Sequence, residues 1–230
     1  MKIAIKFYTL YVILPALMIL RFFSPTTFIP EIPSYFGRMG QIDIPKDYVF
    51  IFNDTFPDII EKSSEMKKFT WPIYEKELRI FYNIGLKKAS DLIIKSDYSD
   101  LEKLLINSIF LFSRDVTARE FHDKLVFILV SIETLLLQNS TEPIQINIGQ
   151  RLAFLTSEKT NDRKRVMELI KEAYSLRSSF VHHGISKPNL TLLQEIQHIV
   201  WTALRNVLVL LDKFDNQKSL IDYIQELNLS

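Results

Sequence analysis

The chain has 230 residues, of which 47% are hydrophobic, 24% charged and 12% aromatic; this composition is typical of a folded globular protein and excludes a disordered tail or a fibre. Its 28 Lys and Arg residues nearly balance its 27 Asp and Glu residues, so nucleic acid or anionic lipid would have to bind at a local basic patch. Cysteine is absent, which excludes disulfides, thiolate zinc sites, iron–sulfur clusters and thiol nucleophiles.

The first feature along the chain is an apolar run over residues 7–20, which Lys2 and Lys6 precede and Arg21 follows. Pro15 interrupts the run, no small-residue cleavage site follows it, and it is shorter than the about 20 residues that span a bilayer. We therefore predict a buried helix, a cytoplasmic protein and no membrane partner. The alternative is a membrane-associated protein that residues 7–20 anchor.

Residues 23–72 are rich in proline, which predicts an irregular segment, and the β-favouring residues 48–52 within it predict one short strand. Together with the apolar helix and the first helices beyond it, this segment makes up a predicted N-terminal region over residues 1–95. That region is expected to hold one or two short strands and helices that pack on the rest of the protein.

From about residue 73 the spacing of apolar residues becomes helical. Ser99 or Asp100 has the residue type that caps a helix, here one that runs to about Ser113. Thr117 and Glu120 then have the spacing of a capping box. The apolar residues that follow at steps of four and three predict an amphipathic core helix; they are Phe121, Leu125, Ile128, Ile132 and Leu135.

Four further helices are predicted towards the C-terminus. A short one follows Pro143 over residues 146–155, and a polar one begins at Asn161 or Asp162 and ends near Gly184. Residues 193–211 and 220–227 predict a long helix and a short last one. The predicted fold is therefore mainly all-α, with a helical bundle over residues 96–230.

Residue types that can take part in catalysis occur together at the end of the polar helix. Arg177 offers a permanent planar cation suited to phosphate oxygens, and a histidine at position 182 or 183 can move a proton near neutral pH. With Ser178, these residues suit phosphoryl transfer without a metal ion. Ser178 and His182 are four residues apart and share a helix face, whereas Arg177 and His182 are about 140° apart around the axis. A long side chain or a second subunit is needed to bring the arginine to the histidine.

This segment resembles the HEPN domains (higher eukaryotes and prokaryotes nucleotide-binding), and within them the Apea-like group. The resemblance consists of Arg177 with Ser178 followed by His182, of Tyr174 before them, and of Gly184 one residue later than usual. Further upstream, positions similar to the group's pattern are Glu133 before a leucine pair and Arg151 before a small apolar run, and the match covers roughly residues 98–215.

The resemblance implies a metal-independent ribonuclease of toxin or antiviral defence systems, which works as a homodimer with its two motifs facing each other. In that scheme the 2′-hydroxyl of RNA attacks the adjacent phosphate, and His182 is the general base or acid. Arg177 stabilises the phosphoryl oxygens, Ser178 orients the histidine or the phosphate, and Glu133 supports Arg177. His183 is either the catalytic ring in place of His182 or a cation at the helix end. We expect RNA rather than DNA as the substrate, with no cofactor.

Two alternatives stay open. The motif also fits a catalytically inactive HEPN module that binds RNA, a nucleotide or a partner protein, in which Arg177 is only a structural brace. The basic run Arg163, Lys164 and Arg165 could track an RNA backbone or form an ordinary charged solvent face. No metal site is predicted, because Glu195 and His198 form only one Glu-x-x-His pair and one pair is insufficient.

Overall fold

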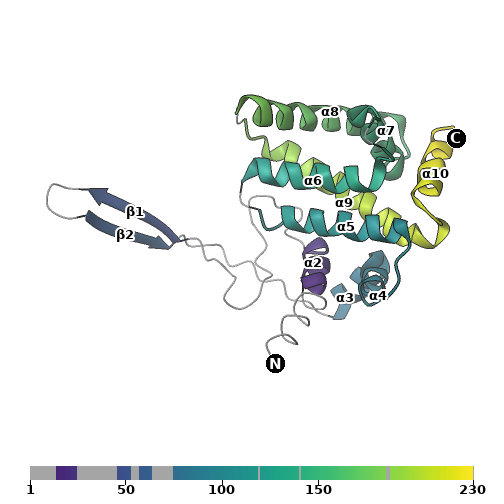
Figure 1. The fold of residues 1–230 in the computed structure, drawn as a ribbon, viewed down its shortest axis with the longest axis horizontal. Helices are drawn as coiled ribbons and strands as arrows, with labels where there is room; N and C mark the ends of the chain where they lie inside the picture. Colours follow the sequence, from purple (N-terminus) through teal and green to yellow (C-terminus); the bar gives the residue numbers. More distant parts are fainter. Residues whose placement is uncertain are drawn as a thin grey trace. The chain divides into compact units, whose positions relative to one another are not determined.

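The structure, a computed structural model, describes residues 14–24, 46–52, 57–63, 75–118, 120–139, 141–184 and 187–229. The chain divides into two units, one formed by residues 1–34 with 73–230 and the other by residues 35–72. The described part of the larger unit is helical, and this confirms the predicted helical bundle (Figure 1). The predicted boundary near residue 95 stays a prediction.

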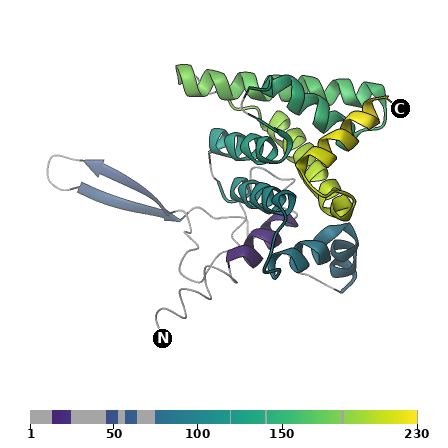
Figure 2. The same ribbon diagram turned by 45° about the vertical axis from the view of Figure 1, so that its right-hand side comes forward.

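The helices of the larger unit follow one another with short connections. They are α2 (Leu14–Phe22), α3 (Glu75–Phe81), the π-helical turn η3 (Tyr82–Leu86), α4 (Lys87–Ile93), α5 (Asp100–Asp115), α6 (Phe121–Leu136), α7 (Ile144–Thr156), α8 (Thr160–His183), α9 (Leu190–Leu210), the 3-10 turn η4 (Leu211–Lys213) and α10 (Gln217–Leu229). Helices α5 and α6 pack together, as do α7 and α8, and α9 contacts all four. Figure 1 shows α8, α6 and α5 stacked one above another with α9 running behind them, and the turned view of Figure 2 shows α9 beside α6 and α5.

The core lies where the predicted apolar stripes of α6 and α9 meet. Along α6, Leu125, Ile128, Ile132 and Leu135 are completely buried, as their spacing predicted. The predicted face of α9 is buried as well, through Leu193, Ile196, Val200, Leu204, Val207 and Leu208. Burying a large aliphatic side chain stabilises the fold by about 1.5 to 3 kcal/mol, so these two stripes are a main source of stability.

Helix α2 is the described part of the predicted apolar helix; residues 7–13 of that prediction lie outside the described residues. Phe22 is fully buried and makes edge contacts with Phe23 and with Phe112 of α5. Its carbonyl oxygen accepts a hydrogen bond of 2.8 Å from Nε1 of Trp201 on α9. Within the described ranges, no helix is both long enough and apolar enough to cross a membrane.

The end of η3 turns sharply at Gly85, whose φ is 121°. A Cβ atom at this position would lie 3.1 Å from Cδ2 of Leu208. Both the positive φ and the close packing against α9 therefore favour glycine here.

The smaller unit contains a two-stranded antiparallel hairpin. Strand β1 (Lys46–Phe52) pairs with β2 (Pro57–Ser63) in a register that runs from Lys46 opposite Ser63 to Phe52 opposite Pro57. This confirms the predicted strand over residues 48–52 and adds the second strand. The rest of the predicted irregular segment, residues 25–45, 53–56 and 64–72, lies outside the described residues.

One predicted helix start is wrong. Thr117 does not cap α6, because its hydroxyl donates to the Arg114 carbonyl oxygen at 3.0 Å and so belongs to the turn that ends α5. Helix α6 begins four residues later, after Glu120, which makes no side-chain cap. The spacing of Thr117 and Glu120 was correct for a capping box, but the first of them is used to close the preceding helix.

The cap predicted for α5 is confirmed and has a measurable consequence. Ser99 accepts a hydrogen bond from the Glu102 backbone N–H, and Glu102 accepts one from the Ser99 N–H at 2.7 Å. The Ser99→Ala variant should lower the free energy of unfolding by about 1 kcal/mol, because an orphan backbone donor loses its acceptor. Chemical denaturation checks this. The exposed Ser96→Ala variant should change that free energy by less than about 0.5 kcal/mol, and an equal loss in both variants would contradict the assignment.

A buried polar cluster joins α5, α6 and α9. Asp115, the last residue of α5, is completely buried and accepts a hydrogen bond of 2.7 Å from Nε2 of Gln197 on α9. Nζ of Lys124 on α6 donates to the Asp115 carbonyl oxygen at 2.9 Å. Burial raises the pKa of the Asp115 carboxyl to about 7, although Lys124 and then the Gln197 hydrogen bond act in the opposite direction.

Candidate active site on helix α8

Helix α8 positions the arginine and the two histidines of the motif. It ends at His183, and Gly184 follows in the left-handed conformation with φ 64°. The Gly184 N–H donates to the Phe180 carbonyl oxygen at 2.9 Å, which is a typical C-terminal cap. His182 and His183 therefore lie in the last turn, where the helix dipole favours a positive charge.

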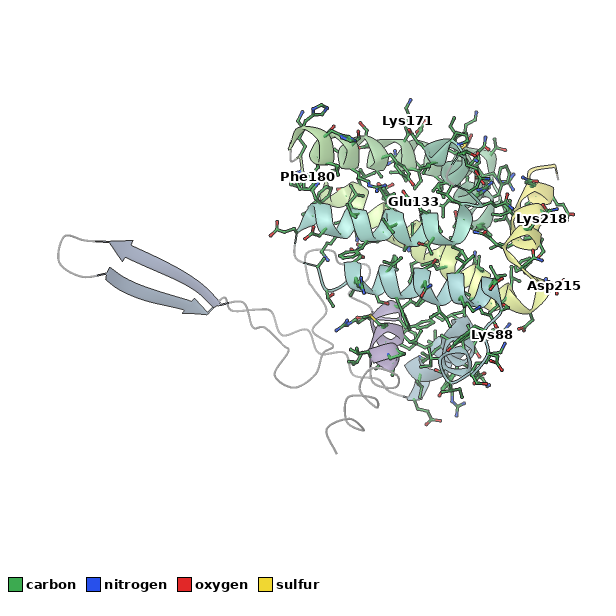
Figure 3. All side chains as sticks on the ribbon, viewed as in Figure 1. Lys88, Glu133, Lys171, Phe180, Asp215 and Lys218 are labelled. Atoms are coloured by element: carbon green, nitrogen blue, oxygen red, sulfur yellow. The ribbon has the colours of Figure 1, made fainter. Side chains whose placement is uncertain are left out.

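The centre of the site is the carboxylate of Glu133 on α6 (Figure 3). Its Oε1 atom accepts two hydrogen bonds of 2.8 Å, one from Nη1 of Arg177 and one from the hydroxyl of Tyr174. The Arg177 and Glu133 side chains are 30% and 17% exposed, so this ion pair is partly shielded from water. The structure thus brings Glu133, Tyr174 and Arg177 together.

Tyr174 is a donor to Glu133 and not a proton carrier at ordinary pH. Burial raises the pKa of its hydroxyl, and the adjacent Glu133 carboxylate raises it further. The phenol therefore keeps its proton and donates a hydrogen bond to the carboxylate. With two donors on one oxygen, Glu133 is fixed in place and in turn orients the guanidinium of Arg177.

Ser178, His182 and His183 lie on the exposed side of α8. The ring centroids of the two histidines are 6.4 Å apart. Among the described residues, no hydrogen bond or ion pair joins Ser178 or His182 to Arg177. A single chain therefore orients the arginine but does not assemble all of the predicted catalytic residues around one point.

Sequence reasoning missed an aromatic contact below the motif. The ring of His122, in the first turn of α6, stacks on that of Phe180, with centroids 3.7 Å apart and planes 4° apart. Phe180 is nevertheless 37% exposed, and the neighbouring Val181 is 59% exposed. The sequence did contain a signal of this apolar surface, because Phe180 and Val181 interrupt a polar helix directly before His182.

The three basic residues near the start of α8 do not form one continuous stripe. Arg165 pairs with Glu195 on α9 at 3.1 Å, whereas Lys164 is exposed. Arg163 folds back, and its Nε donates to the Ser157 carbonyl oxygen at 2.9 Å. Of these three residues, only Lys164 is exposed without a hydrogen bond or ion pair to another described residue.

Two further positions have structural partners. Arg151, which the resemblance singled out, donates to the Leu136 carbonyl oxygen and to Glu142, whose Oε2 lies 2.6 Å from Nη1. It thus ties the end of α6 to α7. Glu195 pairs with Arg165, and no group of three or more His, Asp or Glu side chains that could bind a metal ion occurs among the described residues.

Comparison with known proteins gives no relative: no family model, no curated protein and no solved structure matches this chain.

Proposed function

We propose that the protein is a metal-independent endoribonuclease of the HEPN type that acts as a homodimer. The observation that supports this most is the Glu133 carboxylate, which fixes Arg177 through one nitrogen beside an exposed helix end that carries Ser178 and His182. An arginine with its other donors available and a solvent-accessible imidazole are two groups that metal-free cleavage of RNA can use.

In the proposed reaction, the ribose 2′-oxygen attacks the adjacent phosphorus and the bond from phosphorus to the 5′-oxygen breaks. His182 removes the 2′-hydroxyl proton or supplies a proton to the departing 5′-oxygen, and water takes the other of these two roles. Arg177 stabilises the charge on the phosphoryl oxygens. The products are a 2′,3′-cyclic phosphate and a 5′-hydroxyl. Ser178, four residues before His182 on the same helix face, orients the imidazole or the phosphate.

A second copy of the chain would complete this site. Arg177 turns towards Glu133 while His182 is exposed, so the two groups act on one phosphate most readily across an interface between two α8 helices. Phe180 and Val181 support such an interface, because contact between two copies would remove their exposed apolar surface from water.

The direct test is to incubate the purified protein with labelled RNA, and separately with DNA of the same sequence, in excess EDTA. We expect cleavage of the RNA only, with cyclic-phosphate ends, by a protein that sedimentation shows to be a dimer. Cleavage of DNA, or cleavage that EDTA abolishes, would contradict the proposal.

The second candidate is an inactive module that binds RNA, a nucleotide or a partner protein. It is favoured by the pairing of Arg177 with Glu133, which is also what a purely structural brace would form. A folded dimer that binds labelled RNA without cutting it would support this candidate over the nuclease.

A further inference from the structure

A cavity of about 510 Å³ lies at the end of α8 that is remote from the histidines. Its walls come from η3, from the junction of α7 and α8, and from α9 and α10. Arg163, which lines it, precedes Arg177 by 14 residues, or about 21 Å of helix at 1.5 Å per residue. The cavity is therefore separate from the candidate active site.

Two arginines line this cavity, and both are held in position by neighbours. The Arg163 guanidinium lies 4.3 Å from the ring centroid of Phe154, and its Nε donates to the Ser157 carbonyl oxygen. The Arg205 guanidinium lies 5.2 Å from the Trp201 ring centroid and donates to Oδ1 of Asn206 at 3.0 Å. These contacts leave further N–H donors on each guanidinium, with the planes already oriented.

Neither arginine forms an ion pair with a carboxylate of the described residues. In the described ranges, Arg79, Arg151, Arg165 and Arg177 each lie within 4.0 Å of an acidic side chain. Arg163 and Arg205 have no such partner there, although Glu158 lines the same cavity. Two cations with spare donors at one cavity favour the binding of an anion, and the planar fork of arginine matches phosphate oxygens.

The remaining wall combines an apolar part with polar residues, and the apolar part narrows the class of ligand; the polar residues are Asn83, Thr156, Ser157, Glu158 and Asn206. The apolar part includes Ile84, Leu155, Leu210 and Leu227, together with the ring of Tyr223. A volume of this size suits one small organic molecule. A simple inorganic anion would leave the apolar wall in contact with water, whereas an uncharged molecule would leave the two guanidinium groups without a partner.

We propose that this cavity binds a small phosphate monoester with an aromatic or apolar body, the class that includes nucleoside monophosphates. The phosphate contacts Arg163 and Arg205, and the body contacts the wall formed by Ile84, Leu210 and Tyr223. Arg163 accordingly serves this ligand and not an RNA backbone. The inference does not depend on ribonuclease activity, because it concerns equilibrium binding at a different place on the chain.

Titration calorimetry at low salt with AMP, phenyl phosphate, inorganic phosphate and adenosine tests the proposal. We expect AMP and phenyl phosphate to bind about tenfold more tightly than inorganic phosphate or adenosine, or tighter still. Only these two ligands have both a phosphate for the arginines and a ring for the apolar part of the wall. The Arg205→Gln variant should weaken their binding by about 10- to 100-fold, the usual value of hydrogen bonds to a charged group. Arg79→Gln, a matched change at an exposed arginine on α3, should leave binding unchanged.

A second variant tests the proposal independently, in case Arg205→Gln does not fold. Val209 lines the cavity and is 41% exposed, so Val209→Trp fills the space without disturbing the buried core. It should abolish AMP binding while both arginines remain. The proposal is overturned if no phosphate monoester binds more tightly than about 10 mM, if Arg205→Gln and Val209→Trp both bind AMP like the parent, or if a short RNA binds in an Arg205-dependent manner and AMP does not.

Discussion

Replacing His182 by alanine should lower the rate of RNA cleavage by about 10²- to 10⁴-fold, the range that a general acid or base contributes. The Arg177→Ala variant should fall within a similar range, because the phosphoryl charge loses its fixed cation. The initial rate of cleavage of a labelled RNA in EDTA measures both effects. Since His182 is exposed on the last turn of α8, its removal should change the free energy of unfolding by less than about 0.5 kcal/mol.

Neighbouring residues on α8 supply the matched controls for this prediction. His183→Ala removes an adjacent exposed imidazole, and Ser175→Ala is a control for Ser178→Ala. We expect full activity in His183→Ala and Ser175→Ala, and reduced activity in Ser178→Ala. A loss in His183→Ala with normal activity in His182→Ala would move the catalytic role to His183. Normal activity in both histidine variants and in Arg177→Ala would contradict the mechanism altogether.

The second large effect concerns the buried carboxyl of Asp115 and the pH dependence of stability. Its pKa is about 7 in the folded protein, against an ordinary value of about 3.9 in an unfolded chain. Between those two values the folded state keeps a proton that the unfolded state releases, so the contribution of Asp115 to stability falls as the pH rises. Each pKa unit is equivalent to about 1.4 kcal/mol, and the loss between pH 4 and pH 8 should amount to about 4 kcal/mol.

The comparison with Asp115→Asn isolates this contribution. Asparagine has the same shape and cannot ionise, so the variant should match the parent at pH 4 and exceed its free energy of unfolding by about 4 kcal/mol at pH 8. Urea denaturation at a series of pH values measures the difference. Other groups, such as Glu102, whose pKa is lowered by Lys95 and Ser99 against the opposing effect of burial, cancel in that difference. A difference that stays constant with pH would refute the role assigned to Asp115.

Much of the bundle could be predicted because its helices have simple local signals. The apolar spacing of α6 and α9 gave their buried faces, and Ser99 and Gly184 marked helix ends with the residue types that caps require. Thr117 shows where local reasoning stops. Its spacing to Glu120 suits a capping box, yet whether a hydroxyl caps the following helix or closes the preceding one depends on the course of the chain in space.

The candidate site was predictable in part. Arg177 and Glu133 were linked through family resemblance, and the structure places them 2.8 Å apart although 44 residues separate them. The stack of His122 on Phe180 and the cavity between Arg163 and Arg205 were not foreseen. Both depend on side chains from different helices, and helical periodicity specifies which face of a helix is buried without specifying its neighbour.

The hydrogen bond between Trp201 and the Phe22 carbonyl joins residues that are 179 positions apart. A ribosome adds about 5 to 20 residues per second, so about 10 to 40 s pass between the synthesis of α2 and that of its partner on α9. Phe112 on α5 emerges earlier and contacts the same phenylalanine ring. During translation α2 would therefore be covered on its α5 side first, and its α9 side stays open to chaperones until α9 has been synthesised.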